Sequence, residues 1–166
     1  MSSASKARPV LRDGARIALV VNPAARQGRD RAAIDAVALG LRSRFAVDLV
    51  VPQSADDVER TVSASSTAHD AIVVAGGDGT IHRAVCGLDG SPTPLGVVPM
   101  GTGNDFARGC GIPLSPDEAV RPILEGRTRR VDLIRVNSRI YCTVGLIGVA
   151  SDSALALSRH SRNRMP

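Results

Sequence analysis

The stretch that decides the fold is Ala71–Leu88, AIVVAGGDGTIHRAVCGL. It begins with the apolar run Ala71–Ala75, breaks into the glycine-rich Gly76–Thr80, and resumes with apolar residues at helical spacing. That order predicts a buried strand, a tight turn and a helix. A turn of this kind offers main-chain N–H groups at the positive end of a helix dipole, an arrangement that suits phosphate.

The segments on either side of this stretch repeat its order of strand and then helix. Apolar runs predict strands over 16–21, 47–51 and 95–98, and helical spacing or capping signals predict helices over about 34–45, 54–65 and 115–126. Ser54 and Ser115 are expected to cap the last two of these helices. The repeated unit indicates an α/β fold with a mainly parallel sheet and helices packed on its faces.

The pattern changes after Gly126. The runs Arg129–Val136 and Arg139–Val144 predict two strands joined tightly at Asn137-Ser138, and therefore an antiparallel pair. We expect a mobile tail over 1–15, a nucleotide-binding α/β domain over 16–127, and the start of a β-rich second domain over 128–166. We expect that second domain to be incomplete in this chain.

The composition of the 166 residues is that of a soluble globular protein, 43% hydrophobic and 22% charged. Aromatic residues make up 2%, which leaves almost nothing to stack on nucleic-acid bases. The net charge of +5 is nearly all arginine, and it suits an anionic ligand or membrane surface as well as a plain solvated surface. The three cysteines show no metal spacing, and neither a signal peptide nor a membrane span is recognisable, so we expect a cytoplasmic protein.

Three predicted strands end in loops that can face one edge of the sheet: Asn22–Gly28, Gly76–Thr80 and Met100–Asp105. In an open α/β sheet, ligands bind outside the carboxyl ends of the strands. Glycines in such loops let the main chain approach a phosphate closely. The polar side chains that can contact a ligand or fix loop shape there are Asn22, Thr80, Thr102 and Asn104.

Asp78 is the instructive residue, because its carboxylate would repel a bare polyphosphate. The residue makes sense if Mg²⁺, or water around it, lies between the two, so Gly76–Thr80 predicts a site for a magnesium nucleoside triphosphate. The alternative is that Asp78 caps a helix starting near Thr80. His82 and Arg83 face either this site or solvent, and Asp105 is expected to cap the helix that follows it.

Two motifs together resemble the diacylglycerol kinase catalytic domain family of bacterial lipid kinases, which includes sphingosine kinase relatives. They are GGDGT at Gly76–Thr80 and PLGVVPMGTGNDFARGCGIP at Pro94–Pro113. Asn22-Pro23 also matches the family's opening loop, Asn-Pro-x-Ser-Gly. The resemblance covers about residues 16–148 and corresponds to the family's N-terminal, nucleotide-binding portion.

The resemblance implies a Rossmann-like, three-layer domain that binds Mg·ATP, followed by a β-sandwich, with a lipid phosphorylated between them. The acceptor would be diacylglycerol or a related lipid alcohol, which implies peripheral contact with the inner membrane face. A homodimer is left open as a further partner, because the sequence does not give the oligomeric state. Carried over by motif, the nucleotide contacts are Asn22, Pro23, Ala24, Ala25, Arg26, Gly76, Gly77, Asp78, Gly79, Thr80, Ile81, His82, Gly101, Thr102 and Asn104, with Asp78 holding Mg²⁺ through water.

The chain departs from the family pattern at two places in the proposed site. Ala25-Arg26 stands where the family has Ser-Gly, and His82-Arg83 stands where it has Asn-Glu. The family's general-base glutamate would lie beyond Pro166, so we expect this chain alone to turn over poorly or not at all. Two other functions stay open: a non-catalytic nucleotide-binding module, and a soluble-substrate kinase of the NAD kinase type, which the Pro94–Pro113 run disfavours.

Overall fold

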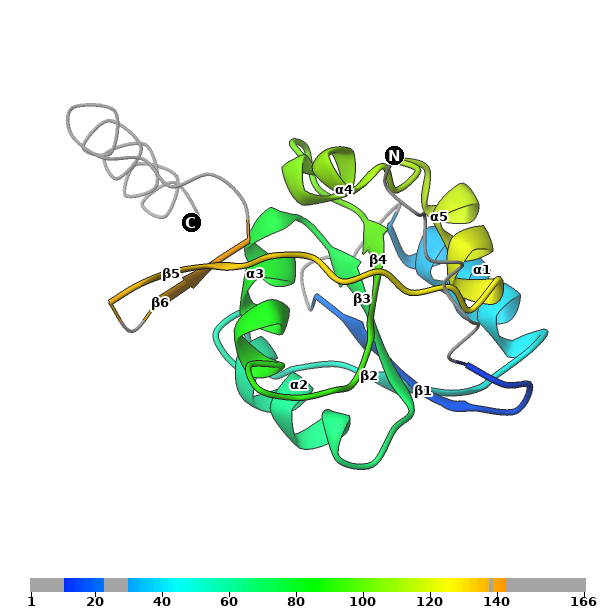
Figure 1. Ribbon diagram of the computed structural model, residues 1–166. Coiled ribbons are helices and arrows are strands. Elements are labelled where there is room, and N and C mark those ends of the chain that lie inside the picture. The colour runs from blue at the N-terminus through cyan, green and yellow to red at the C-terminus, as the bar shows by residue number, and fades with distance from the viewer. Residues whose placement is uncertain (1–10, 23–29, 138, 143–166) are drawn as a thin grey trace, which may run out of the picture.

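The computed structural model describes residues 11–22, 30–137 and 139–142. The described chain alternates strands and helices up to α3 and then continues through β4, two consecutive helices and a short hairpin (Figure 1). The elements are β1 (Arg16–Val21), α1 (Asp30–Arg42), β2 (Ala46–Val50), α2 (Val58–Ser66), β3 (Ala71–Gly76), α3 (Asp78–Gly87), β4 (Leu95–Pro99), α4 (Asp105–Cys110), α5 (Pro116–Leu124), β5 (Ile134–Val136) and β6 (Arg139–Tyr141).

The main sheet has four strands in the order β2-β1-β3-β4, and every pair is parallel. This confirms the predicted α/β class with a parallel sheet. The two central strands are apolar and buried, as expected for strands covered on both faces. The chain moves outward in one direction from β1 and in the other from β3, so these two neighbours flank a topological switch point.

Helices cover both faces of this sheet and produce three layers. Figure 1 shows α1 and α5 on one side and α2 and α3 on the other. Alternation along β1 divides its side chains between two cores: Ile17 and Leu19 pack on the α1–α5 side, whereas Ala18 and Val20 pack on the α2–α3 side. Burial of these aliphatic side chains against the helices provides the main driving force for the fold.

The structure corrects three expectations, about the start of one helix, the extent of the N-terminal tail and the capping of another helix. Helix α2 begins at Val58 because Ser54 is used earlier, where its hydroxyl accepts a hydrogen bond from the Asp57 N–H at 3.3 Å. Leu11 and Ala15, assigned to a mobile tail, are 7% and 4% exposed and belong to the α1–α5 core. Helix α5 does begin after Ser115, but the serine side chain makes no capping hydrogen bond.

The predicted antiparallel pair is present as the hairpin of β5 and β6, and it is shorter than expected. Arg135 pairs with Ile140 in its register, and Asn137 at the turn has a φ of 54°. Ile140 is 6% exposed and packs in a third core with residues of α3 and β4. Residues 129–133 form no strand, and the predicted second strand beyond residue 142 lies outside the described residues.

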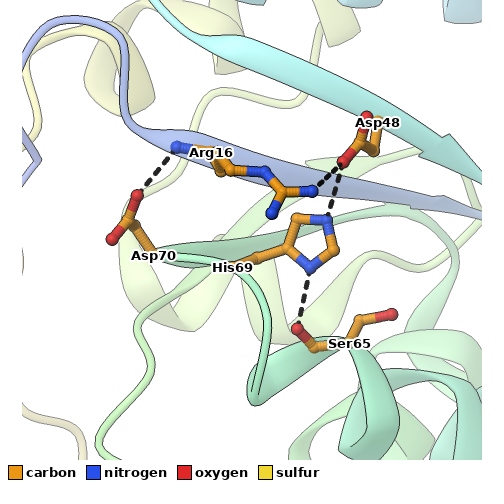
Figure 2. A network of polar contacts seen from close by, with 5 residues as sticks. All are labelled: Arg16, Asp48, Ser65, His69 and Asp70. Carbon is orange, nitrogen blue, oxygen red and sulfur yellow. Dashed lines mark hydrogen bonds and ion pairs between the residues drawn. The ribbon is translucent and has the colours of Figure 1, made fainter.

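A polar network joins the starts of the central strands, at the end of the sheet far from the glycine loops. Figure 2 shows the Arg16 guanidinium donating to Asp48 at 3.0 Å and the Arg16 main-chain N–H donating to Asp70 at 2.8 Å. The His69 ring lies between Asp48, 3.0 Å from Nε2, and the Ser65 carbonyl, 2.8 Å from Nδ1. Hydrogen bonds from Arg16 and then His69 lower the pKa of Asp48.

Candidate functional site

The junction between β3 and α3 is a single residue long. Gly76 ends the strand, Gly77 is the N-cap with φ −86° and ψ −178°, and the helix begins at Asp78. A Cβ at Gly76 would lie 2.7 Å from the Cβ of Thr80, so this position admits no side chain. The predicted turn over Gly76–Thr80 is therefore shorter than expected, because the helix starts inside the motif.

This early start determines which main-chain donors face outward. Thr80 and Ile81 donate their N–H groups to the Gly77 carbonyl at 2.9 and 3.0 Å. The N–H groups of Asp78 and Gly79 precede them in the first turn, where helix geometry provides no intrahelical acceptor. These two donors and the positive end of the α3 dipole suit an anion such as phosphate.

The second glycine loop packs directly against the first. The Met100 N–H donates to the Gly76 carbonyl at 3.0 Å, and a Cβ at Gly101 would lie 2.6 Å from the Cα of Gly77. Two main chains can approach this closely only where both residues are glycine. The structure thus brings the two motifs together, as their positions after neighbouring strands predicted.

Asn104 gives this second loop its shape. It is 7% exposed and lies in the left-handed region, with φ 53° and ψ 42°. Its side chain turns back on Gly101, where Oδ1 accepts the Gly101 N–H at 2.9 Å and Nδ2 donates to the Gly101 carbonyl at 2.8 Å. Asparagine is among the few residues other than glycine that adopt this conformation readily.

The carboxylate of Asp78 reaches across to the second loop. Its Oδ1 accepts a hydrogen bond from the main-chain N–H of Phe106 at 3.1 Å, in the first turn of α4. The alternative interpretation, that Asp78 caps its own helix, is wrong, since Gly77 is the N-cap of α3. The expectation that Asp105 caps α4 is also wrong, because Asn104 is the N-cap and makes no side-chain capping bond.

Asn22, directly after β1, contacts the first glycine loop from the other side of the switch point. The Asn22 N–H donates to the Ala75 carbonyl at 3.2 Å, and its side-chain Nδ2 donates to the Thr80 hydroxyl at 2.9 Å. Thr80 is 6% exposed, so its hydroxyl holds loops together rather than facing solvent. The other residues expected in this loop, Pro23, Ala24, Ala25 and Arg26, lie outside the described residues.

Two predicted ligand contacts have other surroundings. The Ile81 side chain is fully buried in the core between α3 and β4, and its N–H is donated to Gly77. His82 lies toward the β5–β6 hairpin, with Nδ1 3.9 Å from the Cys142 sulfur and its ring 6.0 Å from that of Tyr141. Burial raises the pKa of the Cys142 thiol to about 11. By contrast, Thr102 is exposed and available to a ligand.

Arg83 is engaged in an ion pair that the sequence interpretation missed. Its guanidinium lies 2.7 Å from the carboxylate of Asp56, in the turn before α2. The partners are separated by 27 positions in the chain, so no local pattern signals the contact. The basic residue that replaces the family's glutamate is thereby partly neutralised.

The carboxylates near the site can hold a divalent ion only with help from a ligand. Within the described residues, no group of three His, Cys, Asp or Glu side chains lies close enough to bind a metal. Asp78 lies at the junction of the two loops, and the Asp105 carboxylate is a second acidic group in the second loop. A single carboxylate completed by phosphate oxygens and water is a usual arrangement for Mg²⁺.

A cavity of about 540 Å³ lies elsewhere, along β4 and between α4, α5 and the segment after Gly126. Its walls include Leu95, Gly96, Ile112 and Ile123, and no residue of Gly76–Thr80 or Met100–Asp105 lines it. We locate the candidate site at the glycine loops because main-chain donors and a helix N-terminus provide anion chemistry there. The cavity provides mainly apolar surface.

The fold and the site define a doubly wound α/β domain with two glycine loops in contact beside its switch point. The chain belongs to the diacylglycerol kinase catalytic domain family, whose model matches residues 16–136. It is 32% identical over 156 residues to the diacylglycerol kinase of Mycobacterium tuberculosis (strain ATCC 25618 / H37Rv), covering 91% of this chain and 50% of that protein. The chain therefore spans half the length of this relative.

Two further comparisons agree with this family. A protein of Serratia proteamaculans (strain 568) named "Probable lipid kinase YegS-like" is 42% identical over 74 residues, which cover 42% of this chain and 24% of that protein. The crystal structure of a diacylglycerol kinase from Bacillus anthracis str. Sterne superposes with a TM-score of 0.70 at 28% identity. That match covers 76% of this chain and 47% of the other.

Proposed function

We propose that this domain binds the polyphosphate of Mg·ATP against the two glycine loops. We further propose that the intact protein transfers the γ-phosphoryl group to the hydroxyl of a lipid such as diacylglycerol. The observation that carries the proposal is the main-chain contact of Gly77 with Gly101. It joins the N-terminus of α3 to the second loop at the carboxyl ends of β3 and β4. Lipid kinase names among the relatives support the choice of acceptor.

Each part of the site has a proposed task. The N–H groups of Asp78 and Gly79 donate to phosphate oxygens, and the exposed Thr102 hydroxyl donates from the second loop. Asn22 and Thr80 join the end of β1 to the first turn of α3, which follows β3, through their mutual hydrogen bond. The segment Pro23–Arg26 remains a proposed contact outside the described residues.

Asp78 fits a water-mediated contact with Mg²⁺, because a carboxylate beside a polyphosphate needs a cation between them. The ion supplies charge neutralisation of the phosphates when it is bound. The residues of this chain then hold the nucleotide and orient its terminal phosphate. We infer that the general base and the lipid site belong to the rest of the intact protein, so this chain should bind nucleotide and show little or no turnover.

Gly79 provides a sharp test of binding that leaves the fold intact. It is exposed in the first turn of α3, and a Cβ there would meet only the flexible end of Arg83, at 3.7 Å. Gly79→Leu should keep the melting temperature and weaken Mg·ATP binding by calorimetry at least about tenfold, because the side chain occupies the phosphate position. Gly109→Leu, in open space on α4, is the matched control and should bind like the parent chain.

The outcome also separates the proposal from its rivals. Saturable binding of ATP that weakens without Mg²⁺, and exceeds binding of NAD, supports the kinase assignment. Binding that ignores Mg²⁺ favours a non-catalytic module, and preference for NAD favours a soluble-substrate kinase. Equal ATP affinity in Gly79→Leu and the parent chain would exclude the α3 N-terminus as the phosphate site.

A further inference from the structure

The two oxygens of Asp78 both lie against the second glycine loop. Oδ1 accepts the Phe106 N–H at 3.1 Å, and a Cβ at Gly103 would lie 3.1 Å from Oδ2. Asp78 itself belongs to α3, 28 positions earlier in the chain. One side chain of the first motif therefore contacts the second motif at two points.

Helix α4 needs this contact because it lacks a cap of its own. A polar N-cap side chain normally accepts an N–H of the first turn. The N-cap of α4, Asn104, instead directs its side chain to Gly101, and no capping hydrogen bond is formed. The Asp105 side chain is exposed and makes no hydrogen bond within the described residues. Without Asp78, the Phe106 N–H at this half-buried position would lose its acceptor.

A carboxylate is well suited to this task. An ionised acceptor forms a stronger bond to an N–H group than a neutral one does, and negative charge is favourable at a helix N-terminus. The rest of the second loop depends on the same position, since Arg108 donates its N–H to the Asn104 carbonyl and its Nε to the Gly103 carbonyl, both at 3.0 Å. Fixing the first turn of α4 thus fixes Gly103 and Asn104 as well.

We propose that Asp78 is a positioning residue that caps α4 from another helix and thereby holds the second glycine loop against the first. This inference rests on the proposed function, because it takes the two packed glycine loops to be the nucleotide site. This positioning role of Asp78 requires neither nucleotide nor metal. Oδ1 is committed to Phe106, which leaves Oδ2 for any water around Mg²⁺.

Two substitutions at one position test the proposal. Asp78→Asn keeps an oxygen that can accept the Phe106 N–H and removes the charge, whereas Asp78→Ala removes both. Asp117→Asn is the control, because Asp117 is an exposed acidic residue in the first turn of another helix, α5. The first measurement is hydrogen exchange of the Phe106 amide without nucleotide. The second is affinity for ATP without Mg²⁺, compared between the two Asp78 variants, because both lack the carboxylate charge that repels a bare polyphosphate.

The expected pattern is a rescue by the conservative variant. Exchange of the Phe106 amide should accelerate at least about tenfold in Asp78→Ala and stay within about threefold of the parent in Asp78→Asn and in Asp117→Asn. Metal-free ATP affinity should be lower in Asp78→Ala than in Asp78→Asn, because both variants lack the repelling charge and only Asp78→Ala lacks the acceptor of the Phe106 N–H. Circular dichroism of each variant establishes that it is folded, and Asp78→Asn provides the comparison if Asp78→Ala is not.

Two results would overturn the inference: unchanged Phe106 exchange in Asp78→Ala, or equal acceleration in both Asp78 variants. Failure of the proposed function has a different signature. If the exchange pattern holds and the parent chain binds no ATP, the cap is real and the nucleotide assignment is wrong. If ATP binds and both Asp78 variants lose only its Mg²⁺ dependence while Phe106 exchange is unchanged, the metal role stands and the positioning role falls.

Discussion

Replacing Gly101 with alanine tests whether close packing of the two loops builds the site. A Cβ at this position would lie 2.6 Å from the Cα of Gly77 and 3.0 Å from the Oδ1 of Asn104. Non-bonded carbon atoms prefer about 3.5–4.0 Å, so the loops would have to separate by about 1 Å. Neither neighbour yields easily, because Gly77 joins β3 to α3 and Asn104 is buried.

The cost follows from two effects. Overpacking of a rigid contact costs about 1–3 kcal/mol. The accompanying shift breaks the hydrogen bond from the Gly101 N–H to Asn104, which contributes about 1 kcal/mol. Gly101→Ala should therefore lower the free energy of unfolding by about 2–4 kcal/mol. Gly109→Ala, in helix α4 with open space around it, should be neutral or stabilising by up to about 1 kcal/mol.

Urea unfolding followed by circular dichroism measures both variants, and ATP titration measures the site. We expect the Gly101 variant to lose stability and to bind ATP more weakly even under conditions where it is fully folded. Equal stability of the Gly101 and Gly109 variants would refute the packing argument. A destabilised Gly101 variant with parent-like ATP affinity would separate the packing of the loops from the binding of nucleotide.

Three further outcomes follow from the structure. Asp48→Asn should reduce stability near neutral pH and lose its effect on acidification. The hydrogen bond from Arg16 is the main cause that lowers the pKa of Asp48 below 3.8 in the folded state. The ionised carboxylate therefore stabilises the fold above pH 3.8, and this contribution is lost as the carboxylate is protonated at lower pH. Thermal melts of the variant and the parent chain from pH 7 to pH 3 check this. Cys142, with its pKa raised to about 11, should react with iodoacetamide at pH 8 roughly 100-fold more slowly than a thiol of ordinary pKa, and unfolding in urea should abolish the difference. Asn22→Ala should cost about 1 kcal/mol in urea unfolding, because it removes the donor to the buried Thr80 hydroxyl; no change would show that this bond contributes nothing.

The parallel sheet and its loops could be predicted because their signals are local. Apolar runs such as Ala71–Ala75 are buried on both faces, and glycine clusters mark the points where the chain turns. Position at the carboxyl ends of strands was enough to expect Asn22, Thr80 and Gly101 near one another. The structure confirms the meeting of the two glycine motifs.

The sequence interpretation failed where contacts between residues far apart in the chain determine the local structure or the partner of a side chain. The alternative that Asp78 caps its own helix fails because Gly77 is the N-cap of α3, and the Asp78 carboxylate instead accepts the Phe106 N–H 28 positions later. Arg83 pairs with Asp56 across 27 positions. Residues 129–133 alternate like a strand but form no ladder within the described residues, and Val131 and Leu133 are 46% and 44% exposed. That residues 128–166 begin a β-rich second domain stays a prediction.

Among the described residues, no helix is both long and apolar enough to cross a bilayer. Contact with a membrane surface therefore stays part of the proposal about the lipid acceptor. It can be examined separately, by sedimentation of the chain with anionic vesicles.

The most direct measurement of the central claim is a titration of the isotope-labelled chain with Mg·ATP, followed by amide NMR. The account predicts that the largest shifts fall on the amides of Gly77–Thr80 and Gly101–Asn104, with the amides of Arg16, Asp48 and His69 at the far end of the sheet unchanged. Shifts confined to the cavity beside β4, or spread evenly over the chain, would contradict a nucleotide site at the paired glycine loops.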